Sequence, residues 1–333
     1  MGSSNFDGNA VHWNMEALRQ HLARNGVIGD VSGTLPGCWR VRYQLRGVPP
    51  QVSIIVPTRD ALELIRQCVG SLLEKTRYPR FEILIVDNQS AAPEAMAYLE
   101  QIAGHERVRV LRYDLPFNYS AMNNMAVREA RGEVLCLLNN DTEVISPDWL
   151  DEMVGQLLQP GVGGVGAKLY FPSGQIQHGG DLVGVGGVAN HAHAFLRRDD
   201  PGYCNRAAVA QELSAVTAAC MVTWKDLYQQ LDGLDEKNLK VAFNDVDYCL
   251  RVREAGYRVV WTPHAELYHY ESVSRGKDIS PEKLHRAKRE VAYMRKRWKR
   301  VLQRDPFYNP NLSYERPDFS LSNAPMVEKP WQI

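Results

Sequence analysis

The chain has 333 residues, of which 44% are hydrophobic and 23% charged, and its formal net charge at pH 7 is zero. This length can bury a sizeable core in one large or two small domains. A neutral chain gives no electrostatic sign of a nucleic-acid partner, so none is expected. No apolar run approaches the roughly 20 residues of a membrane-spanning helix, and the N-terminus lacks the apolar core of a signal peptide.

The cysteines are scattered along the chain and no pair has C-x-x-C spacing. They are Cys38, Cys68, Cys136, Cys204, Cys220 and Cys249. This pattern predicts neither a cysteine zinc site nor a disulfide framework, and it favours the reducing cytoplasm.

The first part of the chain predicts an α/β architecture. Residues 1–48 are expected to form an N-terminal extension with one helix at 15–25. Four β-branched or apolar runs then predict strands buried on both faces: 52–56, 81–86, 108–111 and 134–138. Helical spacing separates them, at 61–74 and 120–131, so the expected fold is a central, mostly parallel sheet flanked by helices.

Residues after 145 are less regular. A helix is expected from Ser146 to about residue 158, and further elements are a helix at 245–255, a strand at 257–261 and glycine-rich strands at 165–171 and 182–195. These strands predict a smaller sheet region in the second half of the chain. A basic helix at 281–303 and a surface-wrapping tail after Pro306 complete the chain.

The expected domains follow from this order. They are an extension (1–48), a central domain (49–275, with a first half at 49–145 and a second half at 146–275) and a C-terminal helix and tail (276–333).

Polar residues follow three of the predicted strands, at 57–59, 87–88 and 139–141. Ligands of open α/β sheets bind beyond the carboxyl ends of the strands, so these clusters are expected to converge. Asp87 is either a turn residue or a carboxylate that accepts the imide N–H of uracil or thymine. Asp141 either belongs to an Asx-rich loop or holds a divalent cation that neutralises a diphosphate.

Two further acids, Asp245 and Asp247, open the helix at 245–255, where the helix dipole favours acids whatever their function. At i and i+2 they point in different directions, so one is expected to act as a base and the other to cap the helix or pair with Arg251. His269 follows a strand and is either a metal ligand or structural. His191 and His193 share one face of a predicted strand without a third ligand nearby, so a structural role is expected.

The motifs resemble family 2 of the nucleotide-sugar glycosyltransferases, which have the A-type fold. Four segments look like the family's opening strand, base-binding strand, D-x-D and E-D-x-D: 52–60, 82–90, 139–141 and 244–247. Four more look like signatures of a bacterial surface-polysaccharide (O-antigen, rhamnosyltransferase-like) subgroup: 116–120, 137–144, 269–276 and 305–312. Two acids of the family pattern are replaced, by Asn139 and Asn244.

The resemblance implies inverting transfer from a UDP- or dTDP-sugar to a saccharide or lipid-linked glycan. It also implies that 49–275 is the glycosyltransferase catalytic domain, with a nucleotide-binding half at 49–145 and an acceptor half at 146–275. Asp245 would be the catalytic base, and Asp141 and His269 would hold Mn²⁺ or Mg²⁺. The implied nucleotide-binding residues are Pro57, Thr58, Arg59, Asp87, Asn124, Asn140 and Arg275. Many relatives carry this unit within a longer, multi-domain chain, and the expected location is the cytoplasm.

Two other functions stay open, and so does the role of the basic helix. The fold could serve a non-catalytic carbohydrate-binding module, or a sugar nucleotidyltransferase, although the latter normally needs a glycine-rich phosphate loop where this chain has residues 58–62. The basic helix is either a solvated face or a contact with the anionic cytoplasmic face of the inner membrane.

Overall fold

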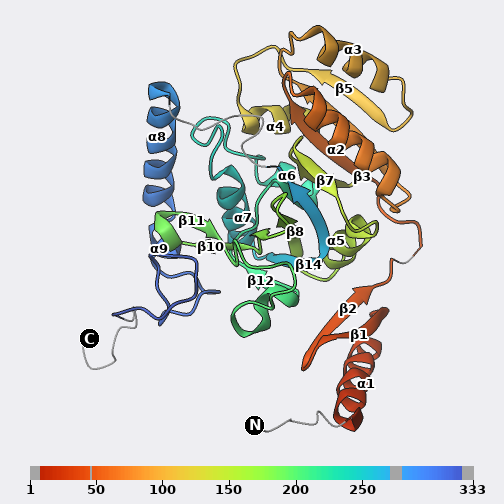
Figure 1. Ribbon diagram of the computed structural model, residues 1–333, viewed down its shortest axis with the longest axis vertical. Coiled ribbons are helices and arrows are strands. Elements are labelled where there is room, and N and C mark those ends of the chain that lie inside the picture. Colours follow the sequence, from red (N-terminus) through yellow and green to blue (C-terminus); the bar gives the residue numbers. More distant parts are fainter. Residues whose placement is uncertain (1–7, 46, 271–279, 325–333) are drawn as a thin grey trace.

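A computed structural model describes residues 8–45, 47–270 and 280–324. Its centre is a ten-stranded sheet (Figure 1). Eight strands follow the order β12-β14-β8-β13-β6-β3-β4-β5, and the other two, β7 and β9, pair with β14 and β8. The expected α/β sheet is therefore present, with one qualification. Strand β13 (Cys220–Trp224) runs antiparallel between β6 (Val134–Leu138) and β8 (Val162–Tyr170) and joins the two halves of the sheet.

The nucleotide-binding half is a parallel sheet covered on both faces. Its strands are β3 (Val52–Thr58), β4 (Phe81–Asp87), β5 (Val108–Arg112) and β6. Alternate residues point to opposite faces, so Ile54 packs with helices α2 (Leu62–Lys75) and α3 (Pro93–Ile102), whereas Ile55 packs with α4 (Tyr119–Glu129). Burial on both faces explains the continuous apolar runs of these strands.

The acceptor half combines long strands with short ones. Helix α5 (Trp149–Leu157) precedes β8, and helices α6 (Lys225–Gln230) and α7 (Asn244–Glu254) precede β14 (Arg258–His269). The remaining strands contain only three residues each: β7 (Thr142–Val144), β9 (Ile176–His178), β10 (Asp181–Val183), β11 (Ala189–His191) and β12 (Gln211–Leu213). Strands β10 and β11 form a separate two-stranded sheet, the smaller region that was expected.

Two expectations for this half were wrong in extent. The strand predicted at 182–195 is the β10–β11 hairpin, because Gly184, Gly186 and Gly187 have positive φ angles and reverse the chain around a short 3-10 turn (Val185–Gly187). The strand predicted at 257–261 continues as β14 to His269, after an irregular register between Trp261 and Glu266.

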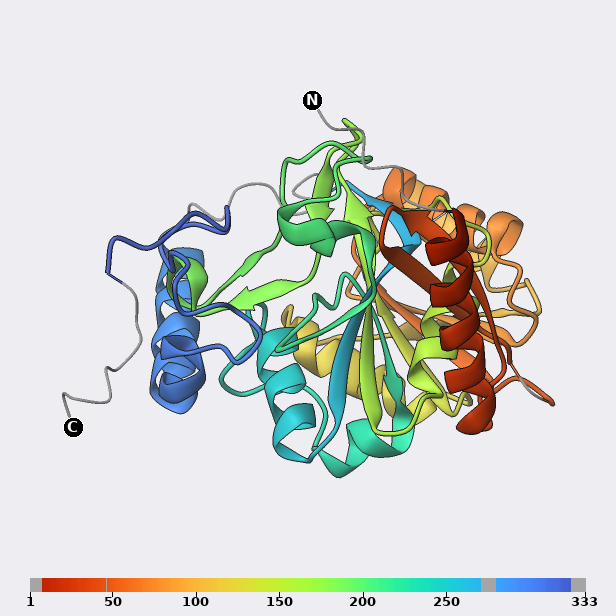
Figure 2. The same ribbon diagram turned by 90° about the horizontal axis from the view of Figure 1, so that it is seen from below.

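The N-terminal extension contains helix α1 (Gly8–Arg24) and a hairpin of β1 (Gly29–Leu35) and β2 (Cys38–Tyr43), which the sequence did not reveal. The hairpin packs against α5, where Arg40 pairs with Glu152. Both views place this unit on the opposite side of the molecule from helix α8 (Figures 1 and 2).

The basic C-terminal helix is not continuous. It consists of α8 (Pro281–Arg297) and α9 (Lys299–Gln303), interrupted at Trp298, whose indole is buried and donates a hydrogen bond to Asp247. The tail then lies over the β10–β11 hairpin, where Tyr308, Leu312 and Phe319 pack against apolar side chains.

In the described parts of the chain, no helix has both the length and the apolar character needed to cross a membrane. The division into domains at residues 48 and 275 stays a prediction, and the second boundary lies outside the described residues.

Candidate functional site

The ends of the parallel strands bring the predicted polar clusters together. Thr58, at the end of β3, lies in register beside Asp87, at the end of β4. The Asn140 side chain donates a 3.0 Å hydrogen bond to the Thr58 hydroxyl, although Asn140 lies beyond the end of β6. The predicted convergence is confirmed. Pro57 is buried inside β3, whereas the Arg59 side chain is more than half exposed beside the edge.

Asp87 is completely buried at this edge. The Arg112 guanidinium pairs with its Oδ2, and the backbone N–H of Ser90 donates to its Oδ1 over 3.2 Å. Arg112 ends β5 and its side chain is half exposed, so it reaches from the buried carboxylate toward solvent. No sequence pattern pointed to Arg112. The base-binding role of Asp87 stays a prediction.

A second polar group forms where β7 pairs with the end of β14, because Thr142 and His269 are register partners. This pairing brings His269 Nε2 to 3.2 Å from Asp141 Oδ1 and to 3.1 Å from the Asn139 amide nitrogen. The other ring nitrogen, Nδ1, lies 2.7 Å from Gln177 Oε1. The two proposed metal ligands therefore lie side by side, although 128 positions separate them in the sequence.

The arrangement around His269 suits a divalent cation. Gln177 Oε1 only accepts hydrogen bonds, so in the neutral ring the proton lies on Nδ1 and the lone pair of Nε2 faces Asp141. A metal-binding histidine characteristically donates its other N–H to such an oxygen. A carboxylate and an imidazole on adjacent strands therefore fit the metal that the resemblance implies.

Asp245 lies in the first turn of helix α7 and is half-buried. Its Oδ2 accepts hydrogen bonds from the Thr217 hydroxyl (3.2 Å) and the Ala218 N–H (3.0 Å), and its Oδ1 accepts one from the Val246 N–H. Burial raises the pKa of Asp245 above its ordinary value, and the negative charge of Asp181 raises it further. A raised pKa suits a general base, which works best near the operating pH.

Asp247 points elsewhere, as its spacing from Asp245 predicts. It is completely buried, and its carboxylate pairs with Arg251 at 2.8 Å and with Arg297 at 3.4 Å. With the bond from Trp298, these contacts tie α7 to α8. The predicted pairing of Asp247 with Arg251 is confirmed.

Asn124 lies on α4, where protein groups occupy its amide. Its Oδ1 accepts from the Tyr228 hydroxyl and the Leu234 N–H, while its Nδ2 donates to the Leu234 carbonyl and to Glu236. These contacts favour a structural role, and nucleotide binding by Asn124 stays a prediction. Arg275 lies outside the described residues.

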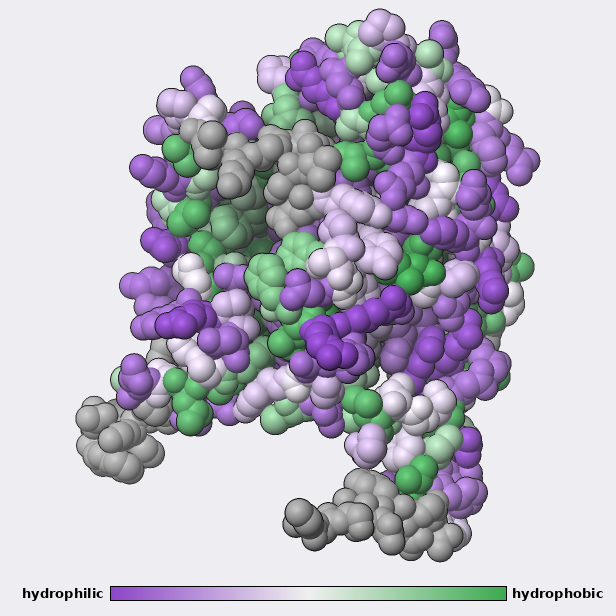
Figure 3. Space-filling view, in the orientation of Figure 1, coloured by the Kyte–Doolittle hydropathy of each residue, from purple (hydrophilic) through white to green (hydrophobic). Residues whose placement is uncertain are grey.

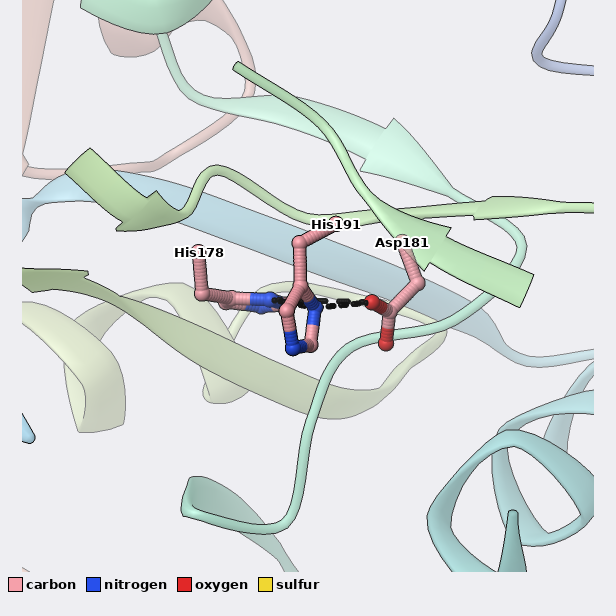
Figure 4. A group of neighbouring side chains, drawn as sticks. All are labelled: His178, Asp181 and His191. Atoms are coloured by element: carbon pink, nitrogen blue, oxygen red, sulfur yellow. Dashed lines mark hydrogen bonds and ion pairs between the residues drawn. The ribbon is translucent and has the colours of Figure 1, made fainter. Parts of the chain in front are cut away.

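His191 has neighbours that the sequence did not place beside it. His178 from β9 and Asp181 from β10 point toward His191 from β11, and the three ligand atoms lie within 4.8 Å of one another (Figure 4). Burial lowers the pKa of His178 to about 3. The expectation that His191 lacks nearby ligands was therefore wrong, because the hairpin brings the three residues together. His193 stacks on Phe319 instead.

Comparison with known proteins agrees with this geometry. The sequence signature described as "Glycosyl transferase family 2" matches residues 53–185, which include Thr58, Asp87 and Asp141. Residues 53–185 are a family 2 glycosyltransferase domain.

Two curated relatives extend the similarity over almost the whole chain. Uncharacterized protein y4gI of Sinorhizobium fredii is 51% identical over 92% of this chain, and O-antigen biosynthesis protein RfbC of Myxococcus xanthus is 42% identical over 93%. The chain spans only 34% and 24% of their respective lengths.

Solved structures share the A-type glycosyltransferase fold. The mannosyltransferase PcManGT of Pyrobaculum calidifontis, in complex with GDP-Man and Mn²⁺, matches 89% of this chain and 80% of its own with a TM-score of 0.51 and 16% identity. GalNAc-T7 with UDP, GalNAc and Mn²⁺ matches 84% of this chain and 53% of its own with a TM-score of 0.59 and 14% identity. At these identities the likeness concerns the fold.

Proposed function

We propose that this glycosyltransferase domain transfers a sugar, with inversion, from a UDP- or dTDP-sugar to a saccharide hydroxyl during synthesis of an O-antigen-like bacterial surface polysaccharide. The observation that carries the proposal is the pairing of Asp141 with His269 at 3.2 Å. It joins the nucleotide-binding half to the last strand of the acceptor half. The similarity to RfbC supports the polysaccharide assignment.

The donor is expected to lie along the edge formed by Pro57, Thr58, Arg59, Asp87 and Asn140. In this arrangement Asp87, held by Arg112, would accept the imide N–H of the base. The exposed Arg59 would meet the negatively charged phosphates. Asp141 and His269 would hold a Mn²⁺ or Mg²⁺ ion, which supplies positive charge against the departing diphosphate.

Asp245 would take the proton of the acceptor hydroxyl. As the hydroxyl oxygen attacks the anomeric carbon, that carbon's bond to the diphosphate oxygen breaks, and its electron pair leaves with the nucleoside diphosphate. The proton passes to the Asp245 carboxylate and later to solvent. One displacement from the side opposite the leaving group inverts the anomeric configuration.

A panel of UDP- and dTDP-sugars, scored for hydrolysis with and without Mn²⁺, tests this function. We expect metal-dependent hydrolysis of at least one of these donors, and none of the corresponding ADP- and CDP-sugars, whose bases lack the imide N–H. A carbohydrate-binding module would bind saccharides without turnover. A nucleotidyltransferase would instead use a nucleoside triphosphate and a sugar 1-phosphate, and either result would reject the proposal.

The acceptor is proposed to be lipid-linked and presented at the cytoplasmic face of the inner membrane. Basic side chains are exposed along the two C-terminal helices: Lys288, Arg289, Arg295, Lys296, Lys299 and Arg300. Hydrophilic side chains colour the outer side of α8 in Figure 3. We expect co-sedimentation with liposomes to increase with the fraction of anionic lipid. Binding that does not depend on anionic lipid would leave these residues as an ordinary solvated face.

A further inference from the structure

The three side chains around His191 form a compact group of potential ligands. His191 Nδ1 lies 2.7 Å from Asp181 Oδ1 and 3.0 Å from His178 Nδ1, and the remaining separation, between His178 Nδ1 and Asp181 Oδ1, is 3.6 Å. The two rings are nearly perpendicular, at 89° (Figure 4). Each side chain thus directs one nitrogen or oxygen at a common point.

Hydrogen bonds account for this convergence only in part. If His191 carries a proton on Nδ1, that proton is shared between Asp181 Oδ1 and the lone pair of His178 Nδ1, and these two acceptors then face each other at 3.6 Å. If His178 carries the proton on Nδ1 instead, the lone pair of His191 faces the Asp181 carboxylate at 2.7 Å. One proton therefore leaves at least one pair of acceptors facing each other, whereas a cation between them would satisfy all three.

The separations also match a metal site. Bonds of about 2.0–2.1 Å in a tetrahedral zinc site place neighbouring ligand atoms about 3.3 Å apart. The three observed separations, from 2.7 to 3.6 Å, bracket that value. Two imidazoles and one carboxylate are a ligand set that zinc and similar transition metals accept, and three protein ligands leave a fourth position open.

The group is open to solvent and lies beside the Asp141–His269 pair without sharing a ligand residue with it. His178 and Asp181 are buried, whereas the His191 side chain is 38% exposed and connects the group to solvent. Gln177, next to His178, contacts His269, and Thr217 donates to Asp245. The Thr217 N–H lies 3.5 Å from His178 Nε2, too far to fix the tautomer of that ring.

We propose that His178, Asp181 and His191 bind a divalent transition-metal cation of the zinc class, with one coordination position open on the side of His191. This site is distinct from the Asp141–His269 pair. It rests on the hairpin geometry and not on sugar transfer, so it can exist even if the proposed transferase activity is absent.

Metal binding by the full chain tests the proposal without any donor. Chelator-treated protein is titrated with Co²⁺, whose visible absorption reports tetrahedral coordination. We expect one equivalent with a tetrahedral spectrum. The His191→Gln substitution should weaken its binding at least about 100-fold, since it removes one ligand from a half-exposed position. His105→Gln, which removes an exposed histidine elsewhere, is the matched control and should bind normally.

Two further measurements separate the outcomes. Asp141→Asn should leave this Co²⁺ spectrum unchanged. If the spectrum disappeared in that variant, the ion would be assigned to the Asp141–His269 pair. In the unsubstituted protein, Zn²⁺ should protect His191 from modification by diethyl pyrocarbonate. This measurement does not require any variant to fold. Equal modification with and without Zn²⁺, or normal Co²⁺ binding by His191→Gln, would overturn the proposal.

Discussion

The two predicted halves of residues 49–275 build their polar sites by different means. In the nucleotide-binding half, regular parallel strands end at the same edge, so neighbouring strand ends place Thr58 beside Asp87. In the acceptor half, short strands and loops bring together residues from separate segments, such as His178, Asp181 and His191, and His269 reaches across to Asp141 of the other half. The first kind of site follows from the regular sheet, whereas the second depends on individual side-chain contacts.

This difference bears on where charge lies. The nucleotide-binding edge couples its buried acid, Asp87, directly to an arginine. In the acceptor half, Asp245 has hydrogen bonds from neutral donors and a second acid, Asp181, near enough to raise its pKa. A carboxylate whose charge is balanced by an arginine, such as Asp87, suits ligand binding. A carboxyl group with a raised pKa, such as Asp245, suits proton transfer. Substitutions in each half should therefore affect different measurements.

The largest expected effect is that of Asp245→Asn. An amide cannot take the acceptor proton, so kcat for transfer should fall about 10²–10⁴-fold, the usual contribution of a general base. Nucleotide affinity, which depends on the other half, should stay within about twofold. Single-turnover transfer and calorimetric binding of the nucleoside diphosphate measure the two quantities. A variant with more than about a tenth of the original rate would exclude Asp245 as the base.

The next effect concerns stability. Asp247→Ala leaves Arg251 and the Trp298 indole without their buried acceptor, and removing one partner of a buried ion pair costs about 3–5 kcal/mol. Urea unfolding should show this loss, while the folded fraction keeps its transfer activity. Glu63→Ala removes an exposed pair with Arg66 and should cost under about 1 kcal/mol. A loss of activity without a loss of stability would contradict the structural role of Asp247.

These two acids also show what a sequence can predict. Apolar runs and helical spacing located β3, β4, β6 and α7 closely, because burial on one or two faces leaves a periodic pattern. The spacing of Asp245 and Asp247 was enough to predict that they act apart. The strand ends were enough to predict that Thr58, Asp87 and Asn140 converge.

Other features left no local pattern. The pairing of Arg112 with Asp87 depends on the register of β4 and β5, and the grouping of His178, Asp181 and His191 depends on a glycine turn. The N-terminal hairpin was missed because β1 is largely exposed, β2 is mostly half-buried, and neither strand has an apolar run. Tertiary contacts decide such features, and one sequence does not display them.

The Asp141–His269 pair offers a smaller and more specific test of how the halves cooperate. Asp141→Asn should weaken Mn²⁺-dependent nucleotide binding about 10–100-fold and leave metal-free binding unchanged, because the amide keeps the shape and loses the charge. Asn139→Asp adds an acid beside His269 and should tighten Mn²⁺ binding instead. Titration of nucleotide with and without Mn²⁺ measures both. Equal loss with and without the metal would indicate that Asp141 acts only in folding.

The smallest expected effect is the pH dependence set by Asp245. Because its pKa is raised in the folded protein, transfer should be lost as pH falls through a value above the ordinary aspartate pKa of about 3.9. The same shift means that this carboxyl destabilises the folded state as pH rises through that range, since the unfolded carboxyl is then ionised and folding must either take up a proton or bury the charge. We would measure kcat/KM and nucleotide affinity from pH 4 to 8. Together these profiles distinguish titration of Asp245 from titration of a group in the nucleotide-binding half. An acid limb shared by both quantities would place the titrating group in the nucleotide-binding half.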